Sequence, residues 1–320
     1  MSASASNKPA LKIQVLAGGI SHERDISLKS GRRLADALTD AGAEVVIREP
    51  DHTLLENIKR DAPDVIWPVV HGATGEDGAL RDVLALTGVP FVGASASSAR
   101  LAWDKSVAKV LVAREGIATP PSLTLPRETF RDLDTESLFG AIIDTLSLPL
   151  VVKPAKSGSA QGVTVVESAD QLARAMVAAY VYCDVAIIEK LIVGTELAIS
   201  VIDLGSGPIA LPAVEIEPID GRYGYDERYT AGETNFYVPA RLDEKDALKA
   251  AQLAISAHSV LGLSHLSRVD IIVDAFGVPW FLEANVAPGM TETSLLPQAV
   301  LASGSTLAEA YLSIAEAATR

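Results

Sequence analysis

The segment from Ser267 to Ser294 constrains the fold of this chain more than any other. Its first half alternates apolar and polar residues at a period of two, and a second alternation follows at residues 278–283. This pattern is typical of two β-strands. The sequence Asp274-Ala-Phe-Gly277 lies between them and favours a turn, because glycine readily adopts a positive φ. The segment is therefore predicted to form an antiparallel β-hairpin.

The polar residues of this hairpin are predicted to gather on one face. Because side chains alternate across a strand, Arg268 and Asp270 share one face of the first strand. Glu283 and Asn285 share a face at the end of the second strand. Antiparallel pairing would bring two carboxylates and an amide oxygen together beside a guanidinium. Such hard oxygen ligands suit Mg²⁺, particularly where phosphate oxygens complete its coordination. The alternative is an ordinary hairpin whose polar face is solvated.

Size, charge and cysteine content limit the classes of protein that fit this chain. Its 320 residues allow one large domain or about two to three small ones. The net charge of −14 argues against a nucleic-acid partner. Apolar runs are too short for a membrane span and the first residues do not resemble a signal peptide, so we expect no membrane partner and a cytoplasmic location. The lone Cys183 excludes an intrachain disulfide and a thiolate metal site.

The first third of the chain alternates short apolar segments with amphipathic ones. Strands are expected at 11–17, 44–47, 64–70 and 89–92, and helices from about residue 26 to Gly42 and over 77–86. This alternation, with glycines at strand ends, is typical of a parallel α/β domain that binds its ligand beyond the carboxyl ends of the strands. The polar residues after those ends are Ser21, His22, Glu23, Ser27, His71, Glu76 and Asp77.

Two of these residues have competing interpretations. Glu23 follows the Gly18-Gly19 turn and could bind a substrate ammonium, or it could be a first-turn acid favoured by the helix dipole. His71 could contact a ligand or could simply be hydrogen-bonded at a strand end. The glycine turn lacks the G-x-G-x-x-G pattern of a dinucleotide site, although a turn of this kind before a helix can accept a carboxylate or phosphate.

The middle of the chain contains two lysines in settings that suit phosphate binding. We expect a linker at residues 94–98 and then a helix over 98–115 that carries Lys105. Lys153 ends an apolar strand, and a glycine-rich loop, 157–162, leads into the next strand. Backbone N–H groups in such a loop can wrap phosphates, with the lysine as a point charge. The alternative is an ordinary hairpin with a loose loop.

The remaining elements frame one long loop. Further expected elements are helices over 131–146, from a Ser168–Gln171 capping box to about 182, from Asp243 to about 261 and from a Thr306–Glu309 capping box, with strands at 185–191, 196–203 and 209–216. The loop at 219–233 carries Arg228 and Tyr229. A loop of that length inside a compact domain is more often functional than neutral.

Several motifs together resemble the D-alanine–D-alanine ligases of the ATP-grasp superfamily. In order they are GGISHERDISLKSG, HGATGEDG, WDK, VVKPAKSGSAQG, EKL, YDERYTAGET, SRVD and LEANVAPGMT, and they cover the chain from about Val15 to Thr306. The resemblance implies an α/β fold of the ATP-grasp type with three α/β domains, the first a parallel-sheet (pre-ATP-grasp) domain. We expect an N-terminal substrate-binding domain at 1–95, a central ATP-grasp domain at 96–188 and a C-terminal ATP-grasp domain at 189–320.

The resemblance also implies an activity and a role for individual residues. The activity is ATP-dependent joining of two D-alanine molecules through an acyl phosphate, for peptidoglycan precursor synthesis, with two Mg²⁺ ions (or Mn²⁺) and a homodimeric assembly. The implied nucleotide-binding residues are Lys105, Lys153, Glu189, Lys190, Leu191, Glu196 and Arg228, and the implied metal ligands are Asp270, Glu283 and Asn285. The implied substrate-binding and catalytic residues are Glu23, His71, Ser159, Tyr229, Arg268, Gly289, Ser294 and Leu295.

Some positions depart from the family pattern. Arg228 stands where most relatives have lysine, and other usual residues are replaced by Ala160, Ser157, Val286 and Ile20. None of these replacements removes a residue that the resemblance implies as a metal ligand. Tyr229 favours peptide formation, since relatives that use D-lactate tend to have phenylalanine in this loop. One alternative is an ATP-grasp ligase that joins D-alanine or another amino acid to D-serine, D-lactate or a similar acceptor. The other is a binding module that keeps the fold without catalysis, against which the intact metal-ligand set argues.

Overall fold

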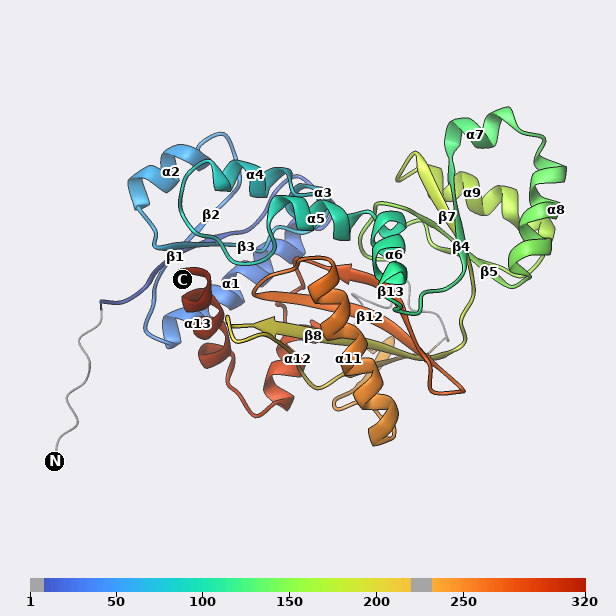
Figure 1. Ribbon diagram of the computed structural model, residues 1–320. Coiled ribbons are helices and arrows are strands. Elements are labelled where there is room, and N and C mark those ends of the chain that lie inside the picture. The colour runs from blue at the N-terminus through green and yellow to red at the C-terminus, as the bar shows by residue number, and fades with distance from the viewer. Residues whose placement is uncertain (1–8, 220–231) are drawn as a thin grey trace.

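Three β-sheets organise the residues that the computed structural model describes, 9–219 and 232–320. Figure 1 shows the N-terminal sheet and the central sheet at opposite ends of the molecule, with the C-terminal sheet between and below them. The C-terminal helix lies beside the N-terminal sheet, although the two come from opposite ends of the chain. The fold is mixed α/β with a parallel N-terminal sheet, as predicted.

The N-terminal sheet is parallel and has the strand order β2-β1-β3. Its strands are β1 (Lys12–Leu16), β2 (Glu44–Arg48) and β3 (Val65–Pro68), and its helices are α1 (Arg24–Asp40), α2 (Leu54–Asp61), α3 (Ala73–Glu76) and α4 (Ala79–Ala85). The strand expected at 89–92 is wrong, because only an isolated bridge joins Ile66 to Phe91. Pro90 has no N–H to donate to a ladder, and Gly93 turns the chain away with φ +101°.

The helix expected over 98–115 is two helices, and the expected linker at 94–98 is also wrong. Ser95 caps α5 (Ala96–Trp103), and Ala94 is fully buried. Asp104 adopts an extended conformation with ψ 97°, which ends α5. Its carboxylate accepts the N–H groups of Ser106 and Val107 and so begins α6 (Lys105–Arg114). Lys105 is therefore the first residue of a helix instead of lying inside one.

The central sheet is antiparallel in the order β4-β7-β5-β6. Its elements are β4 (Ser122–Pro126), α7 (Arg127–Asp132), α8 (Thr135–Leu146), β5 (Leu150–Pro154), β6 (Thr164–Val166), η1 (Ala169–Gln171), α9 (Leu172–Tyr180) and β7 (Val185–Lys190). The helix expected at 131–146 is divided, because Asp134 caps α8 separately. The predicted capping box is absent: Ser168 makes no side-chain cap bond, and Gln171 accepts the N–H of Glu167 instead.

The C-terminal sheet has the order β11-β10-β8-β12-β13, with β9 paired to β8. Its strands are β8 (Gly194–Asp203), β9 (Pro208–Ala210), β10 (Val214–Pro218), β11 (Thr234–Tyr237), β12 (Leu266–Asp274) and β13 (Pro279–Asn285), followed or separated by α11 (Glu244–Val260), α12 (Leu295–Ala302) and α13 (Leu307–Ala318). Asp243 caps α11, and the Thr306–Glu309 capping box opens α13, both as predicted. No helix in the described part of the chain is long and apolar enough to cross a bilayer.

Helices from one predicted domain pack on the sheet of another. Alanines of α5 and α6 share a hydrophobic core with β8, β12 and α11. Tyr311 and Ile314 of α13 share a core with β1 and β3, and the ring of Tyr311 meets that of Trp67 edge-on at 5.8 Å. The N-terminal and C-terminal sheets are thus joined by shared cores, whereas the central sheet has a core of its own with α8 and α9. The predicted domain boundaries stay a prediction.

Candidate active site

The hairpin of β12 and β13 has the predicted pairing. Arg268 lies opposite Asn285, and Asp270 lies opposite Glu283. The Arg268 guanidinium donates through Nε to Oδ1 of Asp270 at 2.7 Å and through Nη2 to Oδ2 at 2.8 Å. The side-chain oxygen of Asn285 accepts the N–H of Ala287 at 2.8 Å. Two carboxylates and an amide oxygen therefore share one hairpin face with a guanidinium, as the alternation predicted.

A β-bulge refines this face. The pairing shifts between Asp270 and Ile271, so that Ile271 lies opposite Phe281 and Leu282 has no partner of its own on β12. An extra residue of this kind re-aims the side chains beside it. Leu282 and Glu283, although adjacent in sequence, both line the same cavity. The simple alternation read from the sequence did not predict this arrangement.

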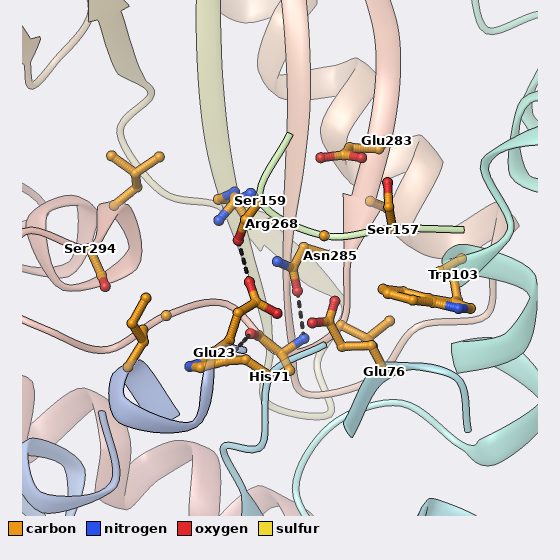
Figure 2. A pocket seen from close by; sticks show the side chains of 18 of the residues that line it. Glu23, His71, Glu76, Trp103, Ser157, Ser159, Arg268, Glu283, Asn285 and Ser294 are labelled. Carbon is orange, nitrogen blue, oxygen red and sulfur yellow. Dashed lines mark hydrogen bonds between the residues drawn. The ribbon is translucent and has the colours of Figure 1, made fainter. Parts of the chain in front are cut away.

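A cavity lies where the loops and helices that follow the N-terminal strands meet the glycine-rich loop and the hairpin. We call it the substrate pocket. Figure 2 shows the carboxylates of Glu23, Glu76 and Glu283 entering it from different sides. Its lining includes these predicted residues: Glu23, His71, Lys105, Ser159, Arg268, Glu283, Asn285, Gly289, Ser294 and Leu295.

Glu23 forms the contact between the N-terminal sheet and the glycine-rich loop. Its carboxylate accepts a short hydrogen bond from the hydroxyl of Ser159 (Figure 2). A Cβ at Gly72 would lie 2.9 Å from Glu23 Oε2, and Gly72 has φ +75°, so only glycine fits beside this carboxylate. Nearby, burial and the charge of Glu23 raise the pKa of Glu76 to about 8. Glu76 accepts the N–H of Gly72 at 2.8 Å.

His71 is bonded to protein through both ring nitrogens. Nδ1 lies 3.1 Å from the carbonyl oxygen of Ala287, and Nε2 lies 3.2 Å from the hydroxyl of Ser30. Because a carbonyl can only accept, Nδ1 carries the hydrogen and Nε2 accepts from Ser30. Ser30 in turn accepts the N–H of Met290 at 3.2 Å. Burial lowers the pKa of His71, so the ring joins α1 to the loop 287–290 in its neutral form.

Ser294 lies on the side of the substrate pocket away from Glu76 and Trp103 (Figure 2). Its hydroxyl accepts the N–H of Thr291 at 2.9 Å and lies 2.8 Å from the Thr291 hydroxyl. A Cβ at Gly289 would lie 2.7 Å from Ser294 Oγ, so any larger residue at this position would have to displace the Ser294 hydroxyl. Leu295 is the first residue of α12. A helix N-terminus here favours a carboxylate ligand.

A second cavity, which we call the nucleotide pocket, lies between the central and C-terminal sheets. It is lined by all the predicted nucleotide-binding residues that the structure describes, namely Lys105, Lys153, Glu189, Lys190, Leu191 and Glu196. Asp270 and the apolar Val163, Val165, Ile272 and Leu282 complete much of its wall. Arg228 and Tyr229 lie outside the described residues, so their predicted roles stay predictions.

The two pockets meet at Lys105, Ser157 and Glu283, which line both of them. Lys105 Nζ lies 3.2 Å from Glu283 Oε2 and donates to the carbonyl oxygen of Ser157 at 2.5 Å. A group held by Lys105 could therefore be passed from one pocket toward the other. This junction is the arrangement that a transfer reaction between two bound molecules requires.

Sequence reasoning missed several residues that line the substrate pocket or support the nucleotide pocket from behind. Glu76 was noted at a strand end without a role, while Trp103 and Thr291 were not singled out, and all three line the substrate pocket. Lys109 was also missed, although it contacts Glu189 inside the protein at 2.6 Å. Its spacing of four residues from Lys105 was the available signal, but a lysine at that spacing is usually solvent-exposed.

The donor atoms of Asp270, Glu283 and Asn285 fit a hard divalent cation. They offer carboxylate and amide oxygens from paired strands where the two pockets meet: Asp270 lines the nucleotide pocket, Asn285 lines the substrate pocket and Glu283 lines both. Phosphate oxygens of a bound nucleotide could complete an octahedron there. In the described residues, no group of three or more His, Cys, Asp or Glu side chains is arranged to hold a metal by itself. A cation at this hairpin would therefore depend on the amide oxygen and on its ligand's phosphates as well as on the two carboxylates.

Comparison with known proteins gives consistent results. A family model described as the D-ala D-ala ligase C-terminus matches residues 111–313. The D-alanine–D-alanine ligase of Pelotomaculum thermopropionicum is 37% identical over 294 residues, which is 92% of each chain. The ligase of the same name from Methylacidiphilum infernorum is 38% identical over 303 residues, which is 94% of each chain.

Two solved structures have the same fold. The VanG D-Ala:D-Ser ligase of Enterococcus faecalis superposes with a TM-score of 0.82 at 27% identity and covers 97% of this chain and 99% of its own. The D-alanine–D-alanine ligase of Bacillus anthracis, solved in complex with ATP, superposes with a TM-score of 0.78 at 28% identity and covers 97% of both chains.

Proposed function

The chain belongs to the D-alanine–D-alanine ligase family, and from this premise we propose that it joins two D-alanine molecules into D-alanyl-D-alanine with ATP as the phosphoryl donor. The observation that carries the proposal is the meeting of the two pockets at Lys105, Ser157 and Glu283. One pocket offers lysines and an apolar wall to a nucleotide, and the other offers carboxylates, a guanidinium and a helix N-terminus to small zwitterions. The product is a precursor of peptidoglycan.

In the proposed first step, the protein aligns a carboxylate with the γ-phosphorus of ATP. Lys105 and Lys153 hold the phosphates, and residues 189–191 with Glu196 lie beside adenine and ribose. Glu23 binds the ammonium of the first D-alanine. A carboxylate oxygen of this D-alanine attacks the γ-phosphorus, and the bond from that phosphorus to the oxygen bridging it to the β-phosphate breaks. ADP departs, and the D-alanine is left as an acyl phosphate. Most of the acceleration in such a transfer comes from positioning and from neutralising charge.

In the proposed second step, the ammonium of the second D-alanine loses one proton to solvent and the resulting amine attacks the acyl carbon. The nitrogen loses its second proton to the departing phosphate. Ser294 and Leu295, at the start of α12, hold the carboxylate of the second D-alanine. Arg268 and the backbone N–H of Gly289 stabilise the oxyanion that develops on the acyl oxygen. The carbon–oxygen bond to phosphate then breaks, which releases phosphate and the dipeptide. His71 acts by fixing the loop 287–290 that carries Gly289, because both of its ring nitrogens are used by protein.

We propose Asp270, Glu283 and Asn285 as the ligands of two Mg²⁺ ions, with Mn²⁺ as a substitute. The donor chemistry of this hairpin face supports the assignment. When bound, the ions would neutralise phosphate charge. The proposal also includes closure of the loop 219–233 over the acyl phosphate through Glu23, Ser159 and Tyr229, which would exclude water. From the family alone we further propose that the enzyme works in the cytoplasm as a homodimer.

D-serine at the second position is the alternative that a specific observation favours. The VanG D-Ala:D-Ser ligase superposes on almost the whole chain. Around Ser294 the substrate pocket is lined by hydroxyl groups of Thr291 and Thr293, which could accept a hydroxymethyl side chain. Tyr229 argues against D-lactate by the family pattern.

The decisive experiment measures phosphate release from ATP with Mg²⁺ and D-alanine, and identifies the product by mass. We expect phosphate release that depends on D-alanine and a product with the mass of D-alanyl-D-alanine. D-serine and D-lactate are then offered in competition with the second D-alanine. Absence of D-alanine-dependent phosphate, or absence of the dipeptide, would rule out the proposed function. A predominant mixed product with D-serine would establish the alternative.

A further inference from the structure

We propose that Lys109 is a positioning residue for the nucleotide: it remains the counter-ion of Glu189 and thereby leaves Lys153 able to bind ATP phosphates. The inference rests on the proposed function, because it requires ATP in the nucleotide pocket. Lys109 lies on α6, four residues after Lys105, and belongs to no set of residues that the sequence motifs assigned.

Lys109, Glu189 and Lys153 form a buried cluster in which two lysines share one carboxylate. Lys109 Nζ lies 2.6 Å from Oε2 of Glu189, and Lys153 Nζ lies 2.6 Å from Oε1 of the same carboxylate. Each carboxylate oxygen therefore has one lysine of its own. Lys109 also donates to the carbonyl oxygen of Pro120 at 2.9 Å. The side chains of Lys109 and Glu189 are each 4% exposed and that of Lys153 is 9% exposed, so water cannot readily substitute for any of these partners.

Lys109 and Lys153 differ in what they can reach. Lys153 and Glu189 line the nucleotide pocket, whereas Lys109 is not part of its wall. Lys109 is held from behind by Pro120 and Glu189, so it cannot act as a phosphate ligand. Lys153 has one carboxylate contact and faces the pocket, so it is the lysine that can exchange a carboxylate for a phosphate.

The charge of the group makes that exchange depend on Lys109. Burial by itself would raise the pKa of Glu189, but Lys153 and Lys109 lower it below its usual value, so the carboxylate is ionised. Burial lowers the pKa of Lys109 to about 8. If Lys153 turns to a phosphate, Lys109 still pairs with Glu189. Without Lys109, the same movement would leave a buried carboxylate with no cation, which is strongly unfavourable.

Helix α6 carries both Lys105 and Lys109. Residues four apart lie on the same helix face, and Lys105 contacts Ser157 and Glu283 at the junction of the pockets while Lys109 contacts Glu189 behind the nucleotide pocket. Asp104 fixes the first turn of this helix. One rigid element therefore carries both cations, and only the first of them reaches the reacting groups.

The test measures binding of AMP-PNP, a non-hydrolysable ATP analogue, with Mg²⁺ by titration calorimetry. Lys109→Met should weaken binding roughly tenfold or more, because Lys153 is then retained by Glu189. The KM for D-alanine should stay near the wild-type value, a split that a general loss of structure would not produce. The matched control is Lys249→Met, since Lys249 likewise contacts one carboxylate, Asp246, at 2.7 Å and one carbonyl, Gly277, at 2.8 Å, but away from both pockets.

A double variant keeps the test valid even if Lys109→Met does not fold. Lys109→Met/Glu189→Gln removes the carboxylate that would retain Lys153, so it should bind AMP-PNP several-fold more tightly than Lys109→Met. If Lys109→Met does not fold, the double variant should still fold, as judged by thermal melting, and bind within roughly threefold of Glu189→Gln. Wild-type affinity in a folded Lys109→Met, or no recovery in the double variant, would overturn the proposal. If the wild type binds AMP-PNP but shows no D-alanine-dependent turnover, the ligase function fails while the role of Lys109 stands.

Discussion

The two faces of strand β12 differ in what their side chains do. On one face, Arg268 and Asp270 form a two-point ion pair at the wall of the pockets. On the other face, Val269, Ile271 and Val273 are at most 3% exposed and share a core with alanines of α11. Both faces arise from one run of nine residues in which alternate side chains point in opposite directions.

The comparison shows that chemistry and stability are separated within a single strand. The apolar face removes area from water and packs closely, which stabilises the fold. The charged face gains little net stability, because removing two ions from water offsets most of their attraction. Changes on the pocket face should therefore alter turnover more than folding, and changes on the core face should do the reverse.

The largest effect is expected on the pocket face, where it continues onto β13. Glu283→Gln removes a carboxylate that lines both pockets and lies 3.2 Å from Lys105. Turnover should fall by more than roughly a hundredfold, because the variant loses a proposed ligand of the cation that would neutralise the transferring phosphoryl group, and such neutralisation is worth several kcal/mol. The melting temperature should change little. D-alanine-dependent phosphate release measures the effect, with Glu292→Gln, an exposed acid nearby, as the control. Wild-type turnover in Glu283→Gln would show that the charged face is not the reacting one.

The core face is tested by a truncation. Ile271→Ala should lower the free energy of unfolding by about 3 kcal/mol, because Ile271 is fully buried between α11 and the sheet. The matched control is Ile272→Ala, one position along, whose side chain lines the nucleotide pocket and is only partly buried. Urea unfolding should show a clearly smaller loss for the control. Equal losses for the two variants would contradict the separation of the faces.

The alternation that creates these two faces could be read from the sequence, and so could most of the site. Arg268 and Asp270 were placed correctly because period two is a local property of a strand. The bulge at Leu282 was not predictable in the same way, since it depends on how β13 meets β12 and on contacts such as that of Phe281 N–H with Ala118. Motif order placed Glu23 and Ser159 together only through the family resemblance, because they are far apart in the sequence.

Other misses also have physical causes. The break at Asp104 was overlooked because the residues on both sides have ordinary helix propensity, and only the capping of Ser106 and Val107 shows that the helix restarts. Lys109 was overlooked because lysine in a helix is usually solvent-exposed, and its burial depends on Glu189, which is remote in sequence. Local patterns therefore predicted elements and faces, while partners across domains required the structure.

A smaller effect is expected when the fork of Arg268 is replaced by a single ammonium. Arg268→Lys keeps the charge but cannot make both bonds to Asp270 at 2.7 and 2.8 Å. Turnover should fall by roughly ten- to a hundredfold, about 2 kcal/mol in the barrier, with the KM for ATP nearly unchanged. The control is Arg241→Lys, because the guanidinium of Arg241, which follows β11, makes a comparable two-point contact with Glu215 of β10 outside the pockets. An equal loss of turnover in both variants would point to a structural role for these pairs.

The smallest effect concerns the core side of β12 and appears only in acid. His258 of α11 contacts the Ser267 hydroxyl through Nδ1 at 2.8 Å, and burial lowers the pKa of His258 to about 4, with opposing contributions from Asp203 and His265. Between about pH 6.5 and 4, His258 is therefore protonated in the unfolded chain but neutral in the folded protein. The free energy of unfolding consequently falls as the pH falls through this range. At pH 5.5 this residue alone should lower the free energy of unfolding by about 1.4 kcal/mol relative to pH 7.5. Urea unfolding of wild type and His258→Gln at both pH values isolates this contribution. Because the group lies behind the strand, the pH dependence of turnover in the variant should match that of the wild type, and a shifted activity profile would show that the two faces of β12 are coupled after all.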